Sequence, residues 1–136
     1  MAATPTNVQF LAALNAMSIT GVVKSYSQPP LSLSTGDLPA GFPMVLSSGQ
    51  GELLSTCIEL SKTRSAGYAI CIEPIGQGTQ VLNYARLAPL LDAFETALDG
   101  LTIANFIEYN LITTTEFQVA GNNYWTIVAE INARSA

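Results

Sequence analysis

Two stretches of the chain carry apolar residues at the spacing of an amphipathic helix. The first follows the helix-start signal Thr4-Pro5-Thr6, and its stripe consists of Phe10, Leu14 and Met17. The stripe of the second recurs at i, i+4, i+7 and i+11 and consists of Leu87, Leu91, Phe94 and Leu98. The pattern predicts helices over residues 4–18 and 82–98. In the second helix, Pro89 either introduces a kink or stands in the first turn, and Gly100 ends the helix.

Other stretches alternate apolar and polar residues with the period of two that strands require. We predict short strands over 22–26 and 44–46, a hairpin of strands 54–61 and 68–72, and further strands over 103–109, 112–120 and 124–133. In the final hairpin, paired residues must face the same side of the sheet. The alternation therefore predicts a loop of residues 121–123 that pairs Val119 with Trp125, and Phe117 with Ile127.

The predicted core lies between one face of this sheet and the second helix, whereas the opposite face, with Thr114, Glu116, Gln118, Thr126, Val128 and Glu130, is expected to be polar. The expected core residues are Ile58, Leu60, Ile70, Ile72, Leu87, Leu91, Phe94, Leu98, Ile103, Ile107, Phe117, Trp125 and Ile127.

Residues 27–43 follow neither pattern. Their sequence, SQPPLSLSTGDLPAGFP, holds four prolines and two glycines in 17 residues, which predicts no regular structure. Leu31, Leu33, Leu38 and Phe42 make it too apolar for a free linker. Loops of this length inside a compact domain are uncommon and are usually functional.

Composition narrows the function. The length of 136 residues fits one domain. Of these residues, 49% are apolar and only 11% are charged, so uncharged polar side chains or a partner subunit must cover much of the surface. The absence of histidine excludes Ser-His-Asp triads, Cys-His dyads and imidazole metal ligands. A net charge of −5 argues against nucleic-acid binding through a basic patch. The apolar runs are too short to span a membrane, and the N-terminus lacks a signal-peptide pattern, so we expect a protein that is not exported.

Two features carry potential chemistry, and for both the sequence favours a structural role. Cys57 and Cys71 are expected to be free buried thiols, in keeping with a reducing compartment. Asp92, Glu95 and Asp99 form an acidic stripe on the second helix, for which a solvated face is favoured over a cation site.

Two further features are weaker. Glu59 and Glu73 on the predicted hairpin are expected to be structural rather than an acid–base pair. Gly76-Gln77-Gly78-Thr79 lacks the lysine and spacing of a phosphate-binding loop and is expected to be a plain turn. We therefore expect no enzymatic activity, no cofactor and no metal, and a protein that binds other proteins.

Several soft motifs recur in a recognisable order along nearly the whole chain. A helix and a strand ending in an aromatic, Val22-Val23-Lys24-Ser25-Tyr26, precede Pro29-Pro30 and Asp37-Leu38-Pro39-Ala40. A hairpin then precedes Leu90-Leu91-Asp92-Ala93-Phe94, and the last strand begins at Gly121-Asn122-Asn123-Tyr124-Trp125-Thr126-Ile127. In this order the chain resembles the tail-terminator (minor tail, tail-completion) proteins of long-tailed bacteriophages.

The resemblance implies a ring, usually a hexamer, at the head-proximal end of the tail tube, where it stops tail polymerisation and offers the surface for head joining. The implied partners are other copies of the chain, the tail-tube protein and a head–tail connector or stopper protein, with DNA only as passing cargo. The implied location is the virion, assembled in the host cytoplasm. The alternatives are another neck protein (a stopper or adaptor), a tail-tube subunit, or, from a different class, a small cytoplasmic ligand-binding α/β module.

Together, pattern and resemblance predict an α+β domain over residues 1–136, with a mixed, mostly antiparallel sheet, two helices on one face and a Pro-rich arm over 27–43. We expect the arm either to reach a neighbouring subunit or to fold back over its own sheet. The candidate assembly contacts are Tyr26, Pro29, Pro30, Leu31, Leu33, Leu38 and Phe42. The candidate acids facing a DNA channel are Asp92, Glu95, Asp99, Glu108, Glu116 and Glu130.

Overall fold

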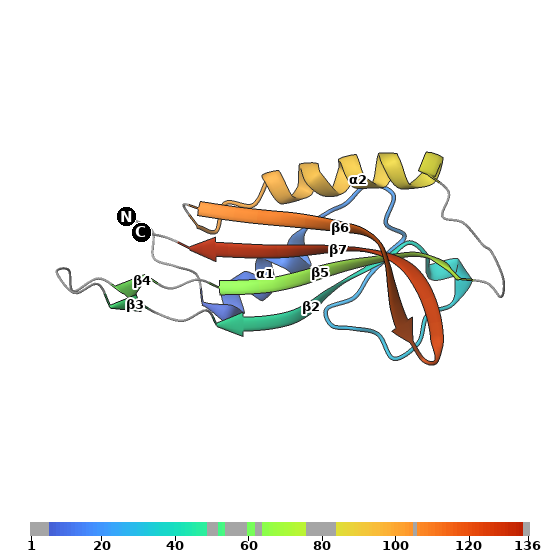
Figure 1. Ribbon diagram of the computed structural model, residues 1–136, viewed down its shortest axis with the longest axis horizontal. Helices are drawn as coiled ribbons and strands as arrows, with labels where there is room; N and C mark the ends of the chain where they lie inside the picture. Colours follow the sequence, from blue (N-terminus) through green and yellow to red (C-terminus); the bar gives the residue numbers. More distant parts are fainter. Residues whose placement is uncertain are drawn as a thin grey trace.

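A five-stranded sheet runs along the molecule, and two helices pack against one of its faces (Figure 1). The computed structural model describes residues 6–48, 52–53, 60–61, 64–75, 84–104 and 106–134. The strand order is β1-β2-β5-β7-β6; β1 pairs with β2 in parallel and the other neighbours are antiparallel. This architecture confirms the predicted α+β class. The sheet strands are β1 (Lys24–Ser25), β2 (Ala40–Ser48), β5 (Arg64–Pro74), β6 (Phe106–Val119) and β7 (Asn122–Arg134).

The first helix, α1 (Asn7–Ala16), begins where the sequence supplies a cap. The Thr6 hydroxyl accepts a hydrogen bond from the backbone N–H of Gln9 at 3.2 Å, and the Gln9 side chain accepts one from the N–H of Thr6 at 2.9 Å. This reciprocal capping box satisfies two backbone donors that a helix start otherwise leaves free. Phe10 and Leu14 are buried against the sheet, as the apolar stripe predicts.

The second helix, α2 (Tyr84–Asp99), includes Pro89 in its second turn rather than at its start. Leu87, Phe94 and Leu98 are buried as predicted, but Leu90 is buried with them and Leu91 is only half-buried. The N–H of Gly100 donates to the carbonyl oxygens of Thr96 and Ala97, both at 3.2 Å, so the helix ends at the predicted glycine.

The first core lies between the helices and the sheet. The Tyr68 ring of β5 meets the Phe94 ring of α2 edge-on, with 5.8 Å between the ring centroids. A glycine in the neighbouring strand makes room for the tyrosine, because a Cβ on Gly41 would lie 2.8 Å from the Tyr68 hydroxyl oxygen. The helix-facing residues of the two central strands complete this core; they are Ala66, Ile70 and Ile72 of β5 and Ile127, Ala129, Ile131 and Ala133 of β7.

A second core lies on the opposite face of the sheet, where the sequence predicts a polar surface. Phe42, Cys71, Val119 and Tyr124 are buried there, and the Phe42 and Phe117 rings lie 5.5 Å apart. Register shifts in β5 and in β6 let the tip of the β6–β7 hairpin curl over this face (Figure 1). The prediction of a polar opposite face is therefore wrong at this end of the sheet.

The β6–β7 register also differs from the prediction. A two-residue turn of Ala120 and Gly121, with φ of 51° and 82°, pairs Val119 with Asn122, and Glu116 pairs with Trp125. Positive φ at both positions is the signature of the tight turns that suit twisted hairpins. The predicted strands 103–109 and 112–120 are one strand, β6, and its bulge between Ile112 and Thr115 changes the register. On the side of the bulge away from the turn, Tyr109 of β6 pairs with Ile131 of β7. Odd-numbered residues of the two strands therefore lie opposite each other there, as the apolar alternation predicts.

The predicted hairpin of strands 54–61 and 68–72 is wrong, because β2 and β7 occupy both edges of β5. Within the predicted strand 54–61, the structure describes only β4 (Leu60–Ser61), and β4 pairs with β3 (Glu52–Leu53). Ile58 and the side chain of Leu60, both expected in the core, lie outside the described residues.

We expect adjacent leucines of α2 to differ in their contribution to stability. Leu90→Ala removes a buried side chain and should lower the free energy of unfolding by about 2–5 kcal/mol. Leu91→Ala serves as the matched control and should cost less, since Leu91 is half-buried. Urea unfolding of the two variants measures the difference, and a larger loss for Leu91→Ala would contradict this packing.

Candidate assembly surfaces

The Pro-rich segment folds back over its own sheet. Leu38 and Phe42 are buried in the second core, and Tyr26 and Leu33 pack against it half-buried. The prediction of no regular structure over 27–43 is wrong at its C-terminal end, where a short 3₁₀ helix, η1 (Thr35–Asp37), leads into β2 at Ala40. The arm was expected either to reach a neighbouring subunit or to fold back over its own sheet, and these four side chains fold back.

Hydrogen bonds fix both ends of the folded segment. The backbone N–H of Val23 donates to the Pro39 carbonyl and that of Tyr26 to the Gly41 carbonyl, each at 2.8 Å. From the hairpin tip, the Tyr124 hydroxyl donates to the carbonyl of Leu33 at 3.3 Å. The segment is thereby tied to both β2 and β7.

A small polar cluster closes the base of the loop. The Ser34 hydroxyl donates to Asp37 Oδ2 at 2.9 Å, and this bond is the main cause of the lowered pKa of the Asp37 carboxyl. The Tyr26 hydroxyl donates to the same oxygen at 3.4 Å, and Lys24 Nζ lies 5.1 Å from the centre of the Tyr26 ring. These contacts hold the two chain segments at the base of the loop together.

The tip of the loop, residues 27–32, remains on the surface. Leu31 is 94% exposed, Pro29 is exposed and Pro30 is half-buried. A shallow pocket of about 440 Å³ lies between the tip and the side chains of Lys24, Tyr26 and Asp37. Among the seven candidate contacts, Leu38 and Phe42 are thus enclosed within the subunit, and the tip carries the accessible apolar side chain.

The six candidate channel acids are all exposed, but they do not share one surface. Asp92, Glu95 and Asp99 are exposed on one flank of α2, from which Asp99 reaches Tyr109 of β6. Glu108 and Glu130 occupy the sheet face opposite the helices, where Glu108 pairs with Asn132 and Glu130 with Asn110. Glu116 pairs with Trp125 near the hairpin tip.

One acid of the α2 stripe joins the helix to the edge of the sheet. The Tyr109 hydroxyl of β6 donates to Asp99 Oδ1 at 2.7 Å. This bond, with lesser contributions from burial and from the charges of Asp99 and Glu95, raises the pKa of Tyr109 to about 12. The carboxylate therefore has a structural partner at the C-terminal end of α2.

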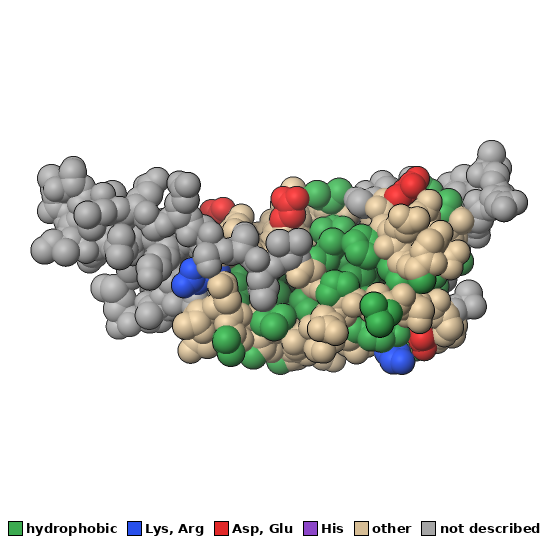
Figure 2. Space-filling view, turned by 90° about the horizontal axis from the view of Figure 1, so that it is seen from below, with side chains coloured by type: hydrophobic (Ala, Val, Ile, Leu, Met, Phe, Trp, Pro, Cys, Tyr) green, Lys and Arg blue, Asp and Glu red, His purple; other side chains and the backbone are tan. Residues whose placement is uncertain are grey.

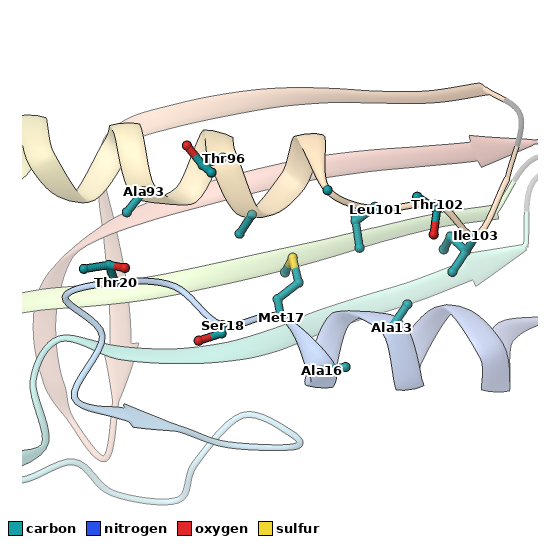
Figure 3. A pocket seen from close by; sticks show the side chains of 12 residues that line it. Ala13, Ala16, Met17, Ser18, Thr20, Ala93, Thr96, Leu101, Thr102 and Ile103 are labelled. Atoms are coloured by element: carbon teal, nitrogen blue, oxygen red, sulfur yellow. The ribbon is translucent and has the colours of Figure 1, made fainter.

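An open groove of about 560 Å³ separates the C-terminal halves of the two helices (Figure 3). Met17 points from the end of α1 toward α2, and Leu101 and Ile103 approach from the segment after α2 (Figure 3). Ala93 and Thr96 line it from α2, and none of the 12 lining residues is charged. The sequence does not predict this groove, since its alanines belong to no motif until the two helices lie side by side.

The cysteine predictions are tested only in part. Cys71 is a free, buried thiol in the second core, and Cys57 lies outside the described residues. The Thr126 hydroxyl donates weakly to the Cys71 sulfur at 3.6 Å, and burial raises the pKa of the thiol to about 11. Cys71 is therefore held in its neutral, unreactive form.

The other chemical candidates give no assembled site. Glu73 is half-buried on β5 and pairs with Trp125, whereas Glu59 and residues 76–79 lie outside the described residues. Within the described ranges, no three His, Cys, Asp or Glu side chains gather as metal ligands would, and no helix combines the length and apolar character needed to cross a membrane. In comparisons with known proteins, neither a family model nor a curated protein matches the sequence.

Removing the Asp99 carboxylate should lower the pKa of Tyr109 from about 12 toward the ordinary value near 10. Because the raised pKa favours the neutral phenol in the folded state, its contribution to stability is complete below about pH 10 and is lost as the pH rises toward 12. Titration of tyrosine absorbance in Asp99→Ala measures the shift, with Glu95→Ala as the control of smaller effect. An unchanged titration in Asp99→Ala would refute the contact.

The Cys71 thiol should react slowly while the protein is folded. In a Cys57→Ser background, alkylation at pH 8 should be at least roughly a hundredfold slower in the folded than in the urea-unfolded protein, because burial suppresses the reactive thiolate. Mass spectrometry over a time course measures both rates. Equal rates would show that Cys71 is not enclosed.

Proposed function

We propose that the protein is a structural subunit of a bacteriophage tail, forming a ring, with six copies expected, that caps the head-proximal end of the tail tube. The order of short sequence motifs, from residues 22–26 through 90–94 to 121–127, resembles that of tail-terminator proteins and carries this proposal; the hairpin predicted before α2 is no part of that support. The fold agrees with the architecture that the resemblance implies, because both α1 and α2 cover a single face of a mixed sheet. In this role the ring stops tail polymerisation and presents a surface to the connector or stopper protein of the head.

The surface supports a role in assembly. Figure 2 shows apolar side chains spread over the middle of one side of the molecule, with few acidic and basic side chains among them. Val8, Val23 and Leu31 are 78%, 61% and 94% exposed. An apolar surface with few charges is suited to contact another protein.

A DNA passage through the ring requires a wall that does not bind phosphate, and clustered acids repel it. Because the acids of α2 and those of the sheet face lie on different surfaces, only one set can line a single channel. The α2 set consists of Asp92, Glu95 and Asp99, and the sheet set contains Glu108 and Glu130.

The mass of the purified full-length chain tests the proposal. Light scattering should give a closed oligomer, with six times the 14.4 kDa subunit mass as the expected value. A monomer at all concentrations would contradict the ring. An open-ended series of masses would favour a tail-tube subunit instead.

A further inference from the structure

The outer edge of β6 is a long row of backbone groups that no described strand pairs. The strand runs from Phe106 to Val119 and stands last in the sheet order, with β7 on its other side. Alternate N–H and C=O groups of an edge strand point away from the sheet, so such an edge is a template for one more strand. Proteins often protect long edges with proline or lysine, and β6 holds neither. Before its bulge, the segment from Ile107 to Ile112 offers about 20 Å of regular edge.

The helix beside this edge is acidic along its near flank. Figure 1 shows α2 running alongside β6, and the Tyr109 hydroxyl of β6 donates to Asp99 Oδ1 at 2.7 Å. Asp92 and Glu95 are exposed on the same flank as Asp99. None of the side chains that the structure describes on α2 and β6 is basic. A strand added to β6 would therefore run beside three carboxylates.

The spacing of these acids suits a strand with basic residues at alternate positions. Asp92 and Asp99 lie about 10 Å apart along the helix axis, and side chains on one face of a strand recur about every 6.8 Å. Two or three basic side chains can therefore meet the carboxylates. The residues between them would point to the other face of the sheet, where Ile112 of β6 is 39% exposed. A segment that alternates basic and apolar residues fits both sides of the edge.

A second copy of the chain does not fit this edge. Two β6 edges side by side would bring the α2 acids and the exposed Glu108 of both copies close together, and like charges repel. The five Lys and Arg residues of the chain nowhere occupy three alternate positions, so no segment of the chain has the required pattern. The occupant that matches the edge is a segment of a different protein.

We propose that the outer edge of β6 pairs with an extended segment of another protein, whose alternate basic residues face the acids of α2. Backbone hydrogen bonds supply the affinity, and the acids select the sequence of the segment. The contact goes beyond the proposed ring and does not depend on it, because it uses no surface of another copy. It makes the α2 acids a protein-binding set, which leaves the sheet set as the candidate wall of a DNA channel.

A short synthetic peptide of alternating lysine and valine tests the contact on the full-length chain. It should bind in a fluorescence anisotropy titration, whereas a peptide of alternating glutamate and valine should not. Asp92→Asn combined with Glu95→Gln should weaken binding at least roughly tenfold, because two of the three carboxylates lose their charge. Asp99 stays unchanged because it holds Tyr109. Glu130→Gln removes an exposed acid of β7 and is the matched control, expected to bind the peptide like the unmodified chain.

N-methylation distinguishes strand pairing from a simple attraction of charges. Alternate N–H groups of an extended peptide point to the same side, so methylating either the lysine or the valine nitrogens removes every donor on one side. One of the two methylated peptides should lose binding and the other should keep it. Equal effects of the two methylations, an unmodified peptide that does not bind, or unchanged affinity in the double variant would overturn the contact while leaving the proposed ring intact.

Discussion

Burial of the central strand β5 on both sides is the constraint on which the rest of the structure depends. Its residues Tyr68, Ile70 and Ile72 face the helices, while Ala69 and Cys71 face the other way, and all five are buried. A strand without a solvated face requires a cover on each side of the sheet. Helices α1 and α2 provide one cover, and the loop after β1 and the curled β6–β7 hairpin provide the other.

Because both faces of β5 are buried, the two ends of the Pro-rich segment and its middle have different roles. Its ends supply Tyr26, Leu33, Leu38 and Phe42 to the second core and so stabilise the subunit. Its middle, held between those ends, leaves the Leu31 side chain 94% exposed. Mutations at the ends are therefore expected to act through folding, whereas mutations at the tip act through association.

The helices were predictable because their information is local. Apolar spacing and the Thr6 to Gln9 capping box lie within one or two turns. The loop tip was also identifiable, since Pro29, Pro30 and Leu31 combine stiffness with apolar character. The groove was not, because Ala13 on α1 and Ala93 on α2 acquire meaning only when the sheet brings the two helices together.

The strand errors share one cause, which is that pairing is decided by distant residues. A hairpin between neighbouring apolar stretches was expected, yet β5 pairs with β2 and with β7, whose residue Ile127 lies opposite Ile70. The sequence predicts the turn at Gly121-Asn122-Asn123. In the structure, Ala120 and Gly121 form the turn, and the bulge in β6 shifts the register of the strands that follow. Bulges of this kind depend on twist and packing rather than on local composition.

Electron microscopy of the purified chain tests most directly the proposal that this domain, with a core on each face of its sheet, assembles into a closed ring. Class averages should show rings of uniform diameter with a central opening. Isolated monomers would contradict the account, and so would filaments, because head-to-tail contacts that do not close extend without limit.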